Sequence, residues 1–132
     1  MTQRNIDVMD IIVSKMKEGA KLSKALKLVY IKRKVCIPCN LNDFDISLMD
    51  LNMSGRTTNA LLRAKLRTLK DVVNFCRDQK ITDIKTLGAN SGIEVFETIL
   101  DYCWDHMDSK ERTSFLIDTV KMNEDYIRVE IA

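Results

Sequence analysis

Between residues 45 and 107 the chain is a series of short amphipathic segments, several of which follow a Ser or Thr. Ser54, Thr68 and Ser91 each precede apolar residues spaced three or four positions apart. This spacing is typical of a helix with one buried face, and Ser and Thr are preferred at helix N-caps. Gly88 interrupts the pattern and allows a positive φ and a sharp turn. The chain is therefore expected to be mostly α-helical.

The composition is that of a globular protein. Of the 132 residues, 45% are hydrophobic and 30% are charged, which favours a packed core over disorder. Aromatic residues make up only 6%, so a platform of aromatic rings that stacks nucleic-acid bases is not expected. The first residues do not resemble a secretory signal, and no apolar run is long enough to span a membrane. A cytoplasmic location is therefore expected.

The net charge of +2 hides basic and acidic blocks. Residues 1–40 carry nine Lys and Arg against three acidic residues, whereas residues 91–132 carry four against ten. Polar turn-forming residues cluster at 40–43. The sequence therefore predicts a basic N-terminal helical segment up to residue 40, a core domain at 41–107 and an acidic C-terminal extension at 108–132.

The N-terminal segment contains a candidate basic patch, formed by Lys24, Lys27, Lys32 and Arg33. Such a patch attracts phosphate groups even when the net charge of the protein is small. Alternatively, these side chains could lie on the solvent face of helices that pack against the core domain. The sequence leaves both interpretations open.

Two short segments alternate apolar and polar residues with a period of two. They are residues 34–37 and the tail at 126–131, and this alternation is typical of a strand. If both are strands, they could form a short β pair that ties the two ends of the chain together. Before them, one helix is expected from Asp7 to Lys17, with Asn5 or Asp7 as its N-cap and Gly19 at its end, and another behind Ser23.

Three blocks in the core carry a more specific pattern. They are residues 48–61 (LMDLNMSGRTTNAL), residues 66–72 (LRTLKDV) and residues 84–91 (IKTLGANS), which are followed by Glu94. In order, spacing and residue type they resemble the C-terminal domain of the bacterial RNA polymerase alpha subunit. The resemblance implies a helix-hairpin-helix core and a non-catalytic role in DNA binding or transcription.

The resemblance also implies roles for individual residues. Arg56 would enter the minor groove of A·T-rich DNA, where the negative potential attracts arginine, and Asn59 would hydrogen-bond beside it. Gly88, Asn90 and Ser91 would line a phosphate site at the start of the following helix. Free N–H groups and the positive end of the helix dipole favour an anion at such a place.

Two positions depart from the family pattern. Asn90 stands where the family has a lysine, and Thr86 stands where it has an asparagine. Loss of one phosphate contact lowers the salt dependence of DNA binding by about one unit. Weak DNA binding is therefore expected.

The cysteines allow a different interpretation. Cys36 and Cys39 are separated by two residues, as are Cys103 and His106, so these four side chains could bind one zinc ion. However, Cys103 falls on an apolar helix face, where a buried thiol is ordinary, and Cys76 is also expected in the core. No metal and no other cofactor are predicted.

The sequence contains no recognisable set of catalytic residues. A Gly-rich phosphate loop with Lys, a Ser/His/Asp set and a pair of carboxylates in an apolar context are all missing. Asp101, Asp105 and Asp108 recur at helical spacing, and a solvated helix face explains them best. The protein is not expected to be an enzyme.

Two functions are therefore considered. The first is a DNA-binding, transcription-associated protein that contacts the minor groove and the phosphate backbone of an A·T-rich duplex. The second is an adaptor that mimics the alpha domain and binds RNA polymerase or a transcription factor without DNA, which Asn90 and the acidic C-terminal third favour. Because 132 residues do not accommodate the assembly domain of an alpha subunit, a free-standing bacterial or phage regulator is expected.

Overall fold

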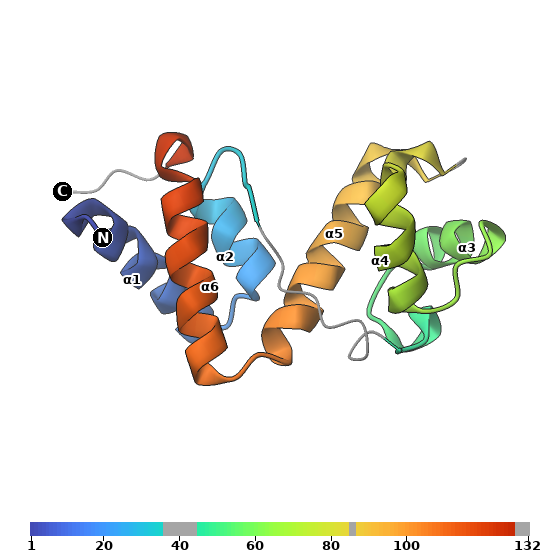
Figure 1. Ribbon diagram of the computed structural model, residues 1–132, viewed down its shortest axis with the longest axis horizontal. Helices are drawn as coiled ribbons and strands as arrows, with labels where there is room; N and C mark the ends of the chain where they lie inside the picture. Colours follow the sequence, from blue (N-terminus) through green and yellow to red (C-terminus); the bar gives the residue numbers. More distant parts are fainter. Residues whose placement is uncertain (36–44, 85–86, 129–132) are drawn as a thin grey trace. The chain divides into compact units, whose positions relative to one another are not determined.

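The protein forms two compact groups of helices (Figure 1). The computed structural model describes residues 1–35, 45–84 and 87–128, and these residues contain six α-helices. Unit 1 combines Met1–Pro38 with Leu100–Ala132, and unit 2 comprises Cys39–Ile99. This grouping differs from the three parts expected from the sequence, because the basic and acidic ends of the chain belong to the same unit.

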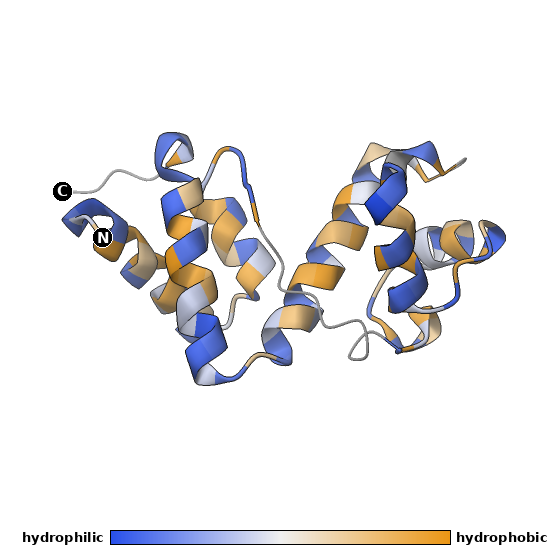
Figure 2. Ribbon diagram, in the orientation of Figure 1, coloured by the Kyte–Doolittle hydropathy of each residue, from blue (hydrophilic) through white to orange (hydrophobic). Residues whose placement is uncertain are grey.

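Unit 1 is built on α1 (Gln3–Lys17), α2 (Leu22–Val29), α6 (Ser109–Met122) and the last part of α5 (Gly88–Asp105). Helix α1 packs against both α2 and α6 (Figure 1). Hydrophobic and hydrophilic positions alternate along these helices (Figure 2), so that each buries one face. The buried residues of unit 1 include Val8, Ile12, Leu22, Leu26, Val29, Tyr30, Phe115, Leu116 and Val120.

The first helix begins earlier than expected and ends where expected. The Thr2 hydroxyl accepts a hydrogen bond from the Asn5 N–H at 3.2 Å, so α1 begins at Gln3 and not near Asp7. Gly19 ends the helix with a φ of +109°, a conformation that glycine adopts without steric cost. Asn5 does not cap a helix; it is buried, and its amide donates to Glu124 Oε1 at 2.5 Å.

The start of α2 is capped by a residue from α5. Its N-cap is Lys21, which makes no side-chain capping bond, so the expectation that Ser23 caps this helix is wrong. Instead, the Ser23 N–H and hydroxyl donate to the two carboxylate oxygens of Asp101, at 2.9 and 2.6 Å. A carboxylate at this position satisfies a free N–H group and complements the helix dipole. Asp101 is therefore a structural residue of unit 1 rather than part of a solvated helix face.

The two ends of the chain are tied together, but at a different place from the one predicted. A single antiparallel bridge joins Tyr30 to Ile127. The Ile31 N–H donates to the Tyr126 carbonyl oxygen at 2.8 Å, and the Arg128 N–H donates to the Val29 carbonyl oxygen at 2.7 Å.

The expected β pair is wrong as far as the described residues extend, since they contain no strand. Lys34 and Val35 have irregular backbone, and residues 36–37 and 129–131 lie outside the described part. Tyr126 belongs to a 3₁₀ turn, η4 (Glu124–Tyr126). The backbone of Lys34 is instead held by the buried Asn123 amide, which accepts from its N–H at 2.7 Å and donates to its carbonyl oxygen at 2.8 Å.

Unit 2 contains η2 (Leu48–Asp50), α3 (Gly55–Arg63), α4 (Leu69–Asp78), η3 (Ile81–Asp83) and the first part of α5. The apolar residues buried in it are Leu48, Ala60, Leu61, Leu69, Val72, Ile84, Leu87, Val95 and Ile99. An isolated antiparallel bridge between Ser47 and Thr68 joins the segment before η2 to the start of α4.

Two of the three helix caps predicted between residues 45 and 107 are confirmed. The Ser54 hydroxyl accepts from the Thr57 N–H at 3.3 Å and caps α3, and Thr68 caps α4. Helix α6 begins at Ser109, and Asp108 is its N-cap. Ser91 is the exception, because α5 already begins at Gly88 and Ser91 lies in its first turn.

Asp71 completes the cap of α4. Its Oδ2 accepts from the N–H groups of Arg67 and Thr68 at 3.0 and 3.1 Å, while the Thr68 hydroxyl accepts from the Asp71 N–H at 3.1 Å. The hydrogen bonds from these two backbone N–H groups lower the pKa of the Asp71 carboxyl from its ordinary value of 3.8.

The cap at Asp71 predicts a pH-dependent stability. Its stabilisation is complete above pH 3.8 and is lost as the pH falls below that value through the lower pKa of the folded state. Asp71→Asn should lower the free energy of unfolding by about 1 kcal/mol at neutral pH and by less at pH 3. Urea unfolding at both pH values measures the difference. The exposed Asp45→Asn is the control, and an equal loss at both pH values would contradict the assignment.

Helix α3 ends in an unusual conformation. It stops at Arg63, and Lys65 adopts a φ of +66°. The N–H groups of Lys65 and Leu66 bond to the carbonyl oxygens of Leu62 and Leu61, at 3.0 and 3.1 Å. This is a Schellman motif with a lysine where glycine is usual.

Replacement of Lys65 by glycine should therefore stabilise unit 2. Lys65→Gly removes the steric cost of the left-handed conformation, although it also increases the entropy of the unfolded state, so we expect a net gain of about 0.5–1 kcal/mol. Lys65→Ala keeps the steric cost of the left-handed conformation and should not raise the free energy of unfolding. Chemical denaturation of the three proteins tests this, and an equal effect of Gly and Ala would show that the backbone is not strained there.

Candidate nucleic-acid interface

One hydrogen bond connects the start of α3 to the start of α5. The Ser54 N–H donates to Glu94 Oε1 at 2.6 Å. Ser54 is the N-cap of α3, and Glu94 lies within the first two turns of α5. The bond therefore holds the N-terminal ends of these two helices together within unit 2.

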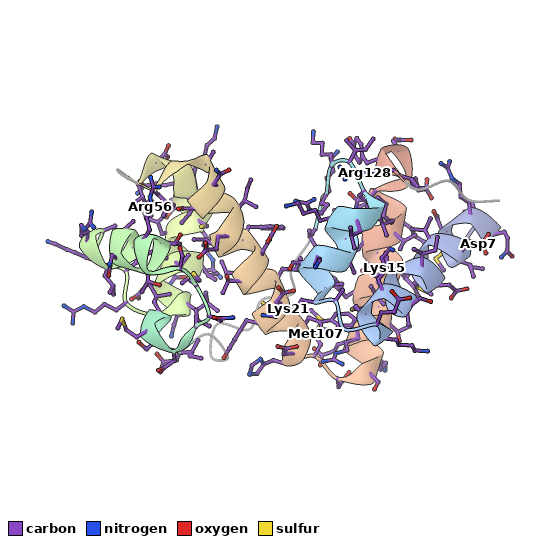
Figure 3. All side chains as sticks on the ribbon, turned by 180° about the vertical axis from the view of Figure 1, so that it is seen from behind. Asp7, Lys15, Lys21, Arg56, Met107 and Arg128 are labelled. Carbon is purple, nitrogen blue, oxygen red and sulfur yellow. The ribbon has the colours of Figure 1, made fainter. Side chains whose placement is uncertain are left out.

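Helix α3 presents two of the predicted DNA-contacting residues to solvent. Arg56 and Asn59 are both exposed and lie about one turn apart, whereas Thr57 and Thr58 between them are buried. In Figure 3 the labelled Arg56 lies toward the end of unit 2 where α5 begins. Among the described residues neither side chain is held by a hydrogen bond or an ion pair, so both are available to a ligand.

The start of α5 holds the other three predicted residues. Gly88 has the positive φ expected from the sequence, +74°, and it is exposed together with Asn90, while Ser91 is half-buried. The buried side chain of Leu87 anchors this turn. A Cβ atom at Gly88 would meet nothing within 4 Å, so glycine is favoured there by the backbone conformation and not by lack of space. The N–H groups of the first helical turn lack partners within their own helix.

Two electrostatic features limit how strongly this surface attracts DNA. Unit 2 carries eight basic and eight acidic residues, so its net charge is zero. Glu94 places a carboxylate near the interface, although the Ser54 N–H partly compensates its charge. The sequence identified Glu94 by its position in the family pattern, but its partner across the fold could not be inferred.

The predicted basic patch belongs to unit 1, whereas the residues of α3 and α5 described above belong to unit 2. Lys24 and Lys27 are exposed on α2, and Arg33 is half-buried after it. The Lys32 ammonium lies 5.7 Å from the centre of the Tyr126 ring, within the range of a cation–π interaction.

The structure gives the cysteine hypothesis no further support. Cys103 is buried, whereas His106 is exposed with its Nδ1 2.8 Å from the Tyr102 carbonyl oxygen. Cys36 and Cys39 lie outside the described residues, and within the described part no group of three metal-binding side chains occurs. Cys76 is exposed, so its expected place in the core is wrong.

Residues 38–101 match the family model for the C-terminal domain of the alpha subunit of bacterial RNA polymerase. The match covers just under half of the sequence and includes α3, α4 and most of α5. It confirms the resemblance: this segment is an alpha C-terminal-like domain, of a family that is non-catalytic and generally connected with DNA or transcription. Comparisons with curated proteins and with solved structures found no match.

Among the described residues no helix is both long and apolar enough to cross a bilayer.

The bond between Ser54 and Glu94 should contribute to the stability of the alpha C-terminal-like domain. Glu94→Ala removes the acceptor and should lower the free energy of unfolding by about 1 kcal/mol, whereas Glu94→Gln keeps an acceptor oxygen and should lose less. Urea unfolding measures both, with Asp50→Ala as a control at an exposed acidic residue. If the Ala variant at position 94 behaves like that control, the bond does not stabilise the domain.

Proposed function

We propose that this protein binds DNA through its alpha C-terminal-like domain as part of transcription regulation. In this proposal Arg56 enters the minor groove of an A·T-rich duplex and Asn59 hydrogen-bonds beside it. Gly88, Asn90 and Ser91 form the phosphate-binding side of the same interface. Phosphate contacts orient the domain, and the groove contacts supply its preference for sequence.

The observation that carries this proposal is the hydrogen bond from the Ser54 N–H to Glu94 at 2.6 Å. It holds the start of α3, which carries Arg56, against the first turns of α5. The exposed N–H groups of a helix start favour an anion, and an arginine next to them adds a formal charge. Such a pair fits a DNA backbone and its adjacent minor groove, whose negative potential attracts arginine.

A second candidate function is supported by the charge of the domain. Unit 2 has no net charge, and Asn90 replaces the lysine of the family pattern, so the domain attracts phosphate only weakly. An adaptor that binds RNA polymerase or a transcription factor does not need this attraction. The first function predicts that the protein binds a purified DNA duplex, and the second predicts that it does not.

Fluorescence anisotropy with a labelled A·T-rich duplex over a salt series distinguishes them. Arg56→Ala should weaken binding at least about tenfold, because a charge-assisted contact is lost. Arg63→Ala is the matched control, since Arg63 is exposed at the opposite end of α3 and its loss changes the net charge equally.

The anisotropy experiment can contradict either the role of Arg56 or DNA binding as a whole. Equal affinities of the wild type and the two arginine variants would contradict a role for Arg56 in the groove. If the wild type does not bind the duplex even at low salt, DNA binding is wrong. The adaptor function is then tested by co-purification with RNA polymerase.

A further inference from the structure

Unit 1 contains a concave surface with a positive charge. The concavity has a volume of about 560 Å³ and lies at the turn between α1 and α2, around Gly19. It is lined by Lys15, Lys21 and Lys24, by one acidic residue, Glu18, and by the apolar side chain of Leu28. Three of the four charged residues that line the concavity are therefore lysines.

The turn at Gly19 brings these lysines together. Lys15 belongs to the last turn of α1, and its carbonyl oxygen accepts from the Ala20 N–H at 3.1 Å, which closes the turn. Lys21 is the N-cap of α2, and Lys24 lies in the first turn of that helix. Only Lys24 belongs to the basic patch predicted from the sequence. Lys15 and Lys21 line the same concavity as Lys24 only because the backbone turns between α1 and α2.

The three ammonium groups are available to a ligand. Lys21 and Lys24 are exposed and Lys15 is half-buried, and among the described residues none of their side chains takes part in a hydrogen bond or an ion pair. Because three lysines line one concavity, an anion bound there is attracted by more than one positive charge. The start of α2 is already occupied by the Asp101 carboxylate, and an incoming anion is therefore held by the lysine side chains.

We propose that this lysine-lined concavity binds backbone phosphates of the duplex that the alpha C-terminal-like domain contacts. The inference rests on the proposed function. It assigns a second, sequence-independent DNA contact to a part of the protein outside the matched family segment. Lysine suits this role, because it acts as a point charge toward phosphate and needs no fixed geometry.

DNA is the proposed ligand because the alpha C-terminal-like domain needs a further source of positive charge to bind a duplex. The domain has no net charge and lacks the lysine of the family at Asn90, whereas three of the four charged residues that line the concavity in unit 1 are lysines. Once the domain is bound to a duplex, nearby phosphates are present at high effective concentration for the rest of the same molecule. Lysine contacts that are weak individually then contribute to binding.

The test compares two triple variants of the full-length protein that lose the same charge. The first is Lys15→Gln, Lys21→Gln and Lys24→Gln. The control is Arg4→Gln, Lys110→Gln and Lys121→Gln, at exposed residues that do not line the concavity. Binding to the labelled A·T-rich duplex is measured by anisotropy from low to physiological salt, and circular dichroism verifies that both variants are folded.

The expected result is a change in salt dependence. Each lost phosphate contact lowers the slope of log Kd against log salt by about 0.9 units, so the first variant should lose about two to three units and the control less than one. If both variants keep the wild-type slope while Arg56→Ala weakens binding, the second contact is wrong and the proposed function stands.

The remaining outcomes separate the two proposals. If the first triple variant loses slope but Arg56→Ala does not weaken binding, the concavity binds phosphate and the groove contact is wrong. Equal losses of slope in both triple variants indicate an effect of net charge alone and overturn the concavity as a site. If the wild type binds no duplex, both proposals are wrong, and an acidic protein segment becomes the candidate ligand.

Discussion

The N–H groups at the start of each helix impose the constraint on which much of this structure depends. A protein built from short helices has many such ends, and each leaves up to four N–H groups without partners in its own helix. Local side chains meet this need at Thr2, Ser54, Thr68 and Asp108. Because each of these caps acts over only three residues, each helix start is determined close to its own position in the sequence.

Two helix starts, one of them that of α3, also receive a hydrogen-bond acceptor from α5. Asp101 accepts from Ser23 at the start of α2 in unit 1, and Glu94 accepts from the N–H of Ser54 at the start of α3 in unit 2. One helix therefore supplies tertiary capping contacts to both units. These carboxylates are stabilising because they meet both the free N–H groups and the positive ends of helix dipoles. In the sequence, Asp101 is indistinguishable from the exposed Asp105.

In our proposal the start of α5 differs from the other helix starts, because its N–H groups bind a ligand. Gly88 turns the backbone into the helix with a positive φ, and the exposed first turn lies within reach of the Ser54 end of α3. In our proposal an external anion, a DNA phosphate, occupies this position. Since Asn90 contributes no charge there, the lysines near Gly19 gain importance as a second source of positive charge.

Features that depend on a few neighbouring residues could be predicted from the sequence. These local features include the caps at Ser54 and Thr68 and the turns at Gly19 and Gly88. They also include the residue pattern by which residues 38–101 match a domain family. Predictions failed where a side chain had two possible uses. Ser23 bonds to Asp101 rather than capping its own helix, and Ser91 lies inside α5.

Contacts between distant residues could not be predicted, because they form only when the helices pack together. Three such contacts join residues that are far apart in the sequence. They are the bridge between Tyr30 and Ile127, the hydrogen bonds between Asn123 and Lys34, and the hydrogen bond between Ser54 and Glu94. A short alternation of apolar and polar residues cannot specify its partner, because register and pairing are set by how whole helices pack. For the same reason the lysines of the concavity form one surface only after α1 and α2 have turned at Gly19.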